Sequence, residues 1–381
     1  MAFARFSRRG LQGAGLACSR LCARSAAAVT LPGRLGDPSM SLATDPRTHP
    51  GAVKALAPFG LDQPQLGPPG APPDAPIRAK LEWASAVELR FQEFKAALVR
   101  TWPAVEGVES RTEVLRGVDG NEVRLYISRP RDAAGPLPCM YHAHGGGMIV
   151  EAAADPFFVY WREAAASTGM IVVGVEFRNG AGRLGPHPFP AGLNDCCSGL
   201  QWTHDSKSSL GYSKLIICGE SGGGNLAIAT ALKAKQEGKL DRFDGVYAMC
   251  PYIYGNYGVR CPSLPSLSEN DGYFLSVDAV AVLAQVYDPS GGNAQNPLAW
   301  PYHATETDVA GLPPVAISVN ELDPLRDEGL AFFRTLVRAG VPATARTVNG
   351  TAHGGDMMLF AAAPEVSYST LRDILSFAES L

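Results

Sequence analysis

The residues with the clearest chemical potential form a short glycine-rich motif around a serine. Residues Gly219–Gly223 read G-E-S-G-G and fit the pattern G-x-S-x-G. They lie between an apolar run at 214–218 and a segment of helical spacing at 225–236, so we expect a strand, a sharp turn and a helix. Glycines in such a turn remove side chains, which exposes the serine hydroxyl at the helix N-terminus. Ser221 is therefore the candidate nucleophile.

A serine nucleophile needs a base that accepts its proton. Downstream of Ser221 the sequence offers His303 and His353. His353 is favoured because it follows a predicted strand at 343–348 and lies in a loop, whereas His303 lies in an irregular stretch at 252–312.

The base needs a carboxylate that orients it, and that acid is expected after the preceding strand at 314–319. Asp323 is the favoured residue, with Glu321 and Asp327 as alternatives. The competing interpretation of Asp323 is a helix N-cap before Pro324.

A second glycine-rich segment lies upstream. Residues His144–Gly147 read H-G-G-G and follow a predicted strand at 136–143. Consecutive glycines let backbone N–H groups approach a tetrahedral oxyanion without interference from side chains. We predict the amides of Gly145 and Gly146, together with that of Gly222, as the donors of an oxyanion hole.

Two other kinds of site are less consistent with the sequence. Residues 222–227 also fit the dinucleotide pattern G-x-G-x-x-A, but the next strand, 245–250, does not end in the required acid, since Asp241 and Asp244 precede it. His142-Ala143-His144 suggests a metal pair, yet no further cluster of His and Asp completes it. We therefore expect no cofactor and no metal.

Composition excludes several function classes. The chain has 381 residues, 46% of them hydrophobic, and a net charge of −4, so it offers no basic field for nucleic acid or an anionic membrane. No apolar run approaches the length of a membrane-spanning helix. The eight cysteines show no paired CxxC spacing, and we expect buried free thiols. The partner is expected to be a small molecule.

From about residue 112 onwards, predicted strands alternate with predicted helices. This alternation predicts an α/β fold with a mostly parallel sheet covered by helices on both faces. Besides the segments already given, the strands are expected at 122–128, 170–177 and 245–250, and the helices at 191–204, 327–339 and 365–380. We assign 108–381 to the catalytic domain, with an insertion at about 252–300.

The N-terminal third has a different character. Residues 1–36 contain six arginines and no acid, the composition of an organellar transit peptide, and we expect residues 1–39 outside the fold. The location is then mitochondrial or another organelle, and otherwise cytoplasmic. Within 40–107, a proline-rich arm at 58–76 precedes an amphipathic helix at 79–100 that could roof a pocket. Residues 1–75 are expected to be dispensable for folding.

These motifs together resemble the hormone-sensitive-lipase-like esterases, an α/β-hydrolase family. The resemblance rests on five pieces of sequence: His144–Gly147, His187–Ala191 with Asp195, Gly219–Asn225, Asp323–Gly329 and His353-Gly354. Phe177-Arg178-Asn179, Glu220 and Gly147-Met148 look closer to the brefeldin A esterase branch. The resemblance implies the α/β-hydrolase fold with a cap from about 75–107 and 252–300.

The same resemblance implies a serine carboxylesterase that hydrolyses small carboxylic esters or lactones through an acyl-enzyme. It assigns Ser221 as nucleophile, Asp323 as acid and His353 as base, with no cofactor, and makes a homodimer an expectation. The alternative is a small-molecule binding protein on the same scaffold, because plant hormone receptors of this family have lost the histidine. The presence of His353 favours an enzyme.

Overall fold

The computed structural model describes residues 31–65, 71–72, 74–259 and 261–381. Its centre is an eight-stranded sheet with the order β1-β2-β4-β3-β5-β6-β7-β8. β2 pairs antiparallel with β1 and β4, and every other neighbouring pair is parallel, as predicted. The strands are β1 (Val108–Arg116), β2 (Glu122–Pro130), β3 (Leu137–Ala143), β4 (Ile171–Glu176), β5 (Tyr212–Glu220), β6 (Gly245–Met249), β7 (Val315–Asn320) and β8 (Ala343–Val348).

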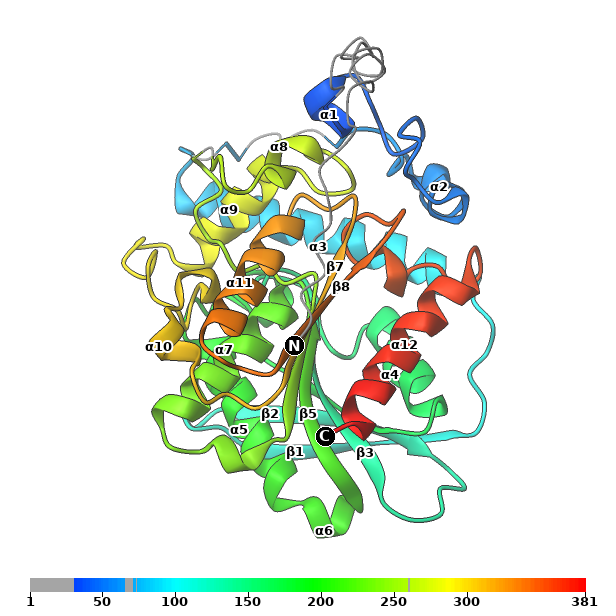
Figure 1. Ribbon diagram of the computed structural model, residues 1–381, viewed down its shortest axis with the longest axis vertical. Helices are drawn as coiled ribbons and strands as arrows, with labels where there is room; N and C mark the ends of the chain where they lie inside the picture. The colour runs from blue at the N-terminus through cyan, green and yellow to red at the C-terminus, as the bar shows by residue number, and fades with distance from the viewer. Residues whose placement is uncertain (1–30, 66–70, 73, 260) are drawn as a thin grey trace, which may run out of the picture.

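Helices cover both faces of this sheet (Figure 1). One face carries α5 (Ala191–Asp205), α7 (Gly222–Gln236) and α11 (Arg326–Arg338), and the other carries α4 (Pro156–Ser167) and α12 (Pro364–Glu379). The remaining α-helices are α1 (Gly33–Gly36), α2 (Pro50–Leu56), α3 (Ile77–Val99), α6 (Lys207–Leu210), α8 (Ser266–Glu269), α9 (Val277–Tyr287) and α10 (Glu306–Val309). The predicted α/β-hydrolase architecture is confirmed.

Alternate residues of the central strands feed two apolar clusters, one on each face of the sheet. In β5, Leu215 and Ile217 belong to one cluster, while Ile216 and Cys218 belong to the other. This follows from the two-residue period of a strand. Each fully buried side chain of this kind contributes about 1.5–3 kcal/mol. The two clusters therefore fix the strand ends from which the catalytic loops depart.

The helix predicted over 79–100 is present as α3, which lies across one end of the sheet beside α9 (Figure 1). Its apolar residues Ala84, Phe94 and Leu98 are buried, as its spacing predicts. Lys80 and Glu88 are buried as well, which an amphipathic pattern alone does not predict. α3 therefore makes polar contacts inside the molecule.

The segment before α3 differs from the expectation. Helix α1 contacts α8, although residues up to 39 are predicted to lie outside the fold. Leu42 and Leu56 are buried in the core, and Arg47 pairs with Glu269 at 2.5 Å. These contacts argue against the prediction that residues 1–75 are dispensable for folding, which deletion of that segment tests. Residues 1–30 of the targeting segment predicted over 1–36 lie outside the described residues.

The described cysteines have free thiols, and four of them, Cys139, Cys196, Cys218 and Cys250, are buried. This agrees with the expectation for those four. Among the described helices, none combines the length and apolar character needed to cross a membrane.

Candidate active site

Ser221 occupies the turn between β5 and α7, as its motif predicts. Its φ of 56° and ψ of −118° place it in a strained conformation for a non-glycine residue. Hydrogen bonds hold the turn: the Ser221 N–H donates to the Met249 carbonyl at 2.9 Å, and its carbonyl accepts from Asn225 N–H at 3.0 Å. A Cβ at Gly219 would lie 2.3 Å from the Gly223 carbonyl oxygen, so this tight turn needs glycine there.

The predicted base and acid meet in space. His353 follows β8, Asp323 follows β7, and His353 Nδ1 lies 2.8 Å from Asp323 Oδ2. Asp323 is fully buried, and its second oxygen accepts from the Leu325 N–H at 2.8 Å. The Asn270 side-chain amide donates to the Asp323 carbonyl at 3.0 Å. With Nδ1–H donated to the carboxylate, the Nε2 atom of His353 is left to accept a proton.

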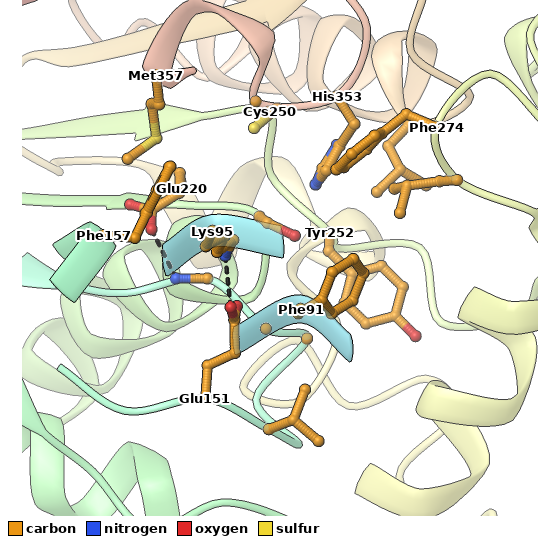
Figure 2. A pocket seen from close by; sticks show the side chains of 18 of the residues that line it. Phe91, Lys95, Glu151, Phe157, Glu220, Cys250, Tyr252, Phe274, His353 and Met357 are labelled. Carbon is orange, nitrogen blue, oxygen red and sulfur yellow. Dashed lines mark hydrogen bonds and ion pairs between the residues drawn. The ribbon is translucent and has the colours of Figure 1, made fainter. Parts of the chain in front are cut away.

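Ser221 and His353 line one pocket of about 80 Å³, together with the three consecutive glycines Gly145, Gly146 and Gly147. These residues come from the loops after β3, β5 and β8, which meet at the carboxyl edge of the parallel strands. Figure 2 shows the His353 ring directed into this pocket. The sequence-predicted serine, histidine and glycine loop are thus brought together.

The Gly145 N–H is not free to act as the predicted oxyanion-hole donor. It donates to Glu220 Oε1 at 2.7 Å (Figure 2), and one N–H bound to a buried carboxylate cannot also serve an oxyanion. Within the described part of the chain, no protein acceptor is bonded to the N–H of Gly146, Gly147 or Gly222. A Cβ at Gly222 would lie 2.7 Å from Gly147 Cα, so these backbones are adjacent. We therefore replace Gly145 by Gly147 among the proposed donors.

Glu220 is a site residue that the sequence analysis used only as a family marker. It is buried, and its Oε2 lies 2.7 Å from His142 Nε2 while its Oε1 accepts from Gly145. One carboxylate thus ties the end of β3 to the glycine loop and the nucleophile turn.

His144 also contacts the glycine loop. Its Nδ1–H donates to the Gly145 carbonyl at 2.8 Å, and its ring stacks on Phe177 at a centroid distance of 4.2 Å. Burial lowers the pKa of His144 well below its usual range, so the ring is neutral. His142 therefore contacts Glu220, and His144 contacts the Gly145 carbonyl, so both rings help to hold the glycine loop.

Cys250 lines the pocket although the sequence analysis gave it no role there. A possible metal-ligand atom of Cys250, one of Asp323 and one of His353 all lie within 4.8 Å of one another. Among the described residues, no other group of three or more His, Cys, Asp or Glu residues is spaced this closely. Burial raises the thiol pKa of Cys250 well above its ordinary value, and the Asp323 charge adds to the shift. The thiol is thus protonated, which makes it a poor nucleophile and a poor metal ligand.

The alternative site residues have other partners. His303 Nε2 lies 3.0 Å from the Tyr254 carbonyl, and Glu321 accepts from the Gly350 N–H at 2.8 Å. Asp327 pairs with Arg326 at 2.9 Å. Asp323 is therefore the one of the three acids that contacts His353.

Apolar side chains wall the pocket, and an outer groove of about 540 Å³ adjoins it. The groove lies between α3 and α9 and contains Trp83 and Val87 of the predicted roof helix. Five side chains line both spaces: Phe91, Phe274, Leu275, Val280 and Leu283. These five side chains form a wall that is common to the pocket beside Ser221 and the outer groove.

Known proteins match this chain over most of its length. The family profile described as alpha/beta hydrolase fold matches residues 140–357, more than half of the chain. The solved structure of brefeldin A esterase, a bacterial homologue of human hormone sensitive lipase, has a TM-score of 0.87 at 44% identity, covering 92% of this chain and 98% of that one. A structure of esterase Est22 has a TM-score of 0.80 at 40% identity, covering 89% and 99%.

Curated relatives carry related names. Carboxylesterase NlhH of Mycobacterium tuberculosis is 30% identical over 252 residues, 65% of this chain and 75% of NlhH. An arylesterase of Saccharolobus solfataricus is 31% identical over 238 residues, 61% of this chain and 71% of that protein.

The chain belongs to the α/β-hydrolase fold family. Within that family it is similar to brefeldin A esterase, a bacterial homologue of hormone-sensitive lipase. Its activity is that of a carboxylic-ester hydrolase of the serine type, and the binding-protein alternative is not favoured.

Proposed function

We propose that Ser221, His353 and Asp323 hydrolyse esters through an acyl-enzyme. Ser221 Oγ attacks the ester carbonyl carbon while His353 Nε2 accepts the hydroxyl proton, and Asp323 stabilises the resulting imidazolium. The amides of Gly146, Gly147 and Gly222 donate to the oxyanion. His353 then protonates the departing alcohol, and a water activated by the same nitrogen releases the acid and restores Ser221.

One observation carries this proposal: His353, which lies 2.8 Å from the buried Asp323, lines a single pocket together with the strained Ser221 and the glycine loop. A base held in one tautomer, a nucleophile on a rigid turn and fixed amide donors together supply the elements of acyl transfer.

Partitioning of the intermediate tests the acyl-enzyme. Acetate esters of several alcohols are hydrolysed in water containing methanol, and methyl acetate and acetic acid are measured. Because every substrate forms the same acetyl-Ser221, we expect one product ratio for all of them. A ratio that changes with the departing alcohol would contradict a common acyl-enzyme.

We further propose that the ester is asymmetric, with a short acyl group and a bulky apolar alcohol. The proton donor His353 must face the departing alcohol, and in Figure 2 His353 and Phe274 lie on one side of the pocket, opposite Phe157 and Glu151. Phe274 also lines the outer groove of about 540 Å³, whereas the space beside Ser221 is about 80 Å³. On this proposal, the bulky alcohol extends past Phe274 towards the larger outer groove.

Two isomeric esters test this asymmetry: 2-naphthylmethyl acetate and methyl 2-naphthylacetate, each corrected for its alkaline hydrolysis rate. We expect the acetate to be preferred at least about tenfold in kcat/KM, or about 1.4 kcal/mol in barrier. Equal values, or preference for the methyl ester, would refute the assignment.

We also propose a homodimer and a cytoplasmic location. If residues 1–36 act as a transit peptide, the location is instead mitochondrial or in another organelle. Light scattering of the purified protein tests the first, and cell fractionation tests the second.

A further inference from the structure

Helix α3 makes two polar contacts with Glu151 of the hydrolase core, one of them buried and the other partly buried. Glu88 Oε1 accepts from the Glu151 N–H at 3.0 Å, and Lys95 Nζ donates to Glu151 Oε1 at 2.5 Å (Figure 2). Glu88 and Lys95 are two helical turns apart, so both project from the same side of α3. Glu88 and Glu151 are buried, and the Lys95 side chain is 13% exposed.

Glu151 directly follows the turn that carries the proposed oxyanion donors. The Gly146 carbonyl accepts from the N–H groups of Ile149 at 3.0 Å and Val150 at 3.1 Å, which closes that turn. A Cβ at Gly146 would lie 2.2 Å from the Val150 carbonyl oxygen and 3.2 Å from Glu151 Oε2. The Glu151 carboxylate therefore lies against the glycine whose amide must point at the oxyanion.

Glu151 is held at every polar atom of its backbone and by its side chain. Its φ of 75° is strained for a residue with a Cβ, and Asn179 Nδ2 donates to its carbonyl at 2.6 Å. Such a conformation persists when the surroundings determine it, and here Glu88, Lys95 and Asn179 do so together.

Burial of these charges does not by itself stabilise the fold. Removing a carboxylate and an ammonium from water costs several kcal/mol per ion, which their attraction offsets only with good geometry. Lys95 Nζ also lies 4.6 Å from the ring centroids of both Phe157 and Phe158, a partner set that limits its positions. The Lys95–Glu151 ion pair is therefore well suited to fixing the position of Glu151 relative to α3.

We propose that Glu88 and Lys95 are positioning residues for the oxyanion hole. They hold Glu151, and through it the turn at 146–150, so that the amides of Gly146 and Gly147 meet the developing negative charge. The inference rests on the proposed function, and it makes α3 part of the catalytic framework as well as a wall of the pocket.

The test is Lys95→Met, which keeps the apolar stem and removes the charge and the donor. We expect kcat to fall about 10- to 100-fold with KM changed less than about threefold, because a displaced donor weakens the transition state more than the bound ester. Affinity for a trifluoromethyl ketone, whose adduct with a serine carries an oxyanion, should fall by the same factor. Glu151→Gln, which keeps an oxygen for Lys95, should lose less.

Leu371→Ala is the matched control, since Leu371 is buried in α12 and lines neither the pocket nor the outer groove. It should lower the melting temperature and leave the ketone affinity unchanged. If Lys95→Met does not fold, Glu88→Met provides a second comparison, because it removes the acceptor of the Glu151 N–H together with the Glu88 contacts to Arg183. It should likewise lower the ketone affinity, and unchanged affinity in the folded variant would overturn the proposal.

Two results would overturn the proposal. The first is unchanged ketone affinity in folded Lys95→Met protein. The second is a loss confined to some acyl groups, which would make Lys95 a direct substrate contact. Covalent labelling of wild-type Ser221 by an organophosphonate separates these failures from failure of the proposed function, because labelling does not depend on this role of Lys95.

Discussion

Replacing Glu220 by alanine should damage both the fold and the catalytic loop. The substitution leaves the Gly145 N–H and His142 Nε2 without their carboxylate partner, at positions now 2.7 Å from its two oxygens. Hydrogen bonds to a charged group contribute about 1.5–3 kcal/mol each, so the free energy of unfolding should fall by about 3–6 kcal/mol. Because the glycine loop loses its anchor, kcat should also fall at least about tenfold.

Urea unfolding followed by circular dichroism measures the first effect, and initial rates on an acetate ester measure the second. Glu220→Gln is the matched control, since its amide oxygen can still accept from one donor, and it should lose about half as much stability. A Glu220→Ala protein within about 0.5 kcal/mol of wild type, the range of ordinary surface changes, would show that this carboxylate does not hold the loop.

Three further predictions follow from the contacts. Asp323→Asn should lower kcat about 10³- to 10⁴-fold with little change in fold, because the histidine loses the partner that fixes its tautomer; near-normal kcat would contradict that role. Deleting residues 1–75 should lower the melting temperature markedly, because it removes buried Leu42 and Leu56 and the Arg47–Glu269 pair, and an unchanged value would contradict their role in the core. Iodoacetamide at pH 8 should modify Cys261 before Cys250. Burial alone would raise the Cys261 pKa, but hydrogen bonds with Ser263, Tyr254 and Leu264 together outweigh it and lower that pKa. Burial raises the pKa of the Cys250 thiol well above its ordinary value. Peptide mass spectrometry decides the order, and earlier modification of Cys250 would be the contrary result.

The sequence predicts the catalytic strands well because their signals are local. The run at 170–177 is apolar except for Glu176, and the corresponding strand β4 is buried at every residue before Glu176. The Ser221 turn is equally local, because strand, glycines and helix are adjacent in the chain.

Other parts of the site depend on contacts between distant residues. Glu220 accepts a hydrogen bond from the Gly145 N–H, although the two residues are 75 positions apart in the sequence. No spacing rule predicts which of three glycine N–H groups donates to a carboxylate. Cys250 joins the pocket because β6 lies beside β5 and β7, which is a property of the strand order.

Some elements were absent from the prediction for simpler reasons. Edge strand β1 is largely exposed, so most of it has no alternating apolar pattern. Helix α4 could have been found, because Asp155-Pro156 is a helix-start signal before the aromatic pair Phe157-Phe158. The buried segment around Leu42 has too few apolar residues to predict a core contact.

The mass of the enzyme after reaction with a fluorophosphonate tests the nucleophile directly. We expect one phosphonyl group per chain, located by fragmentation on Ser221, with loss of esterase activity in proportion to labelling. Ser221→Ala protein of unchanged fold should take up no label and hydrolyse no ester above background. Label on a different residue, or turnover by the Ser221→Ala protein, would contradict the assignment of Ser221 as the nucleophile.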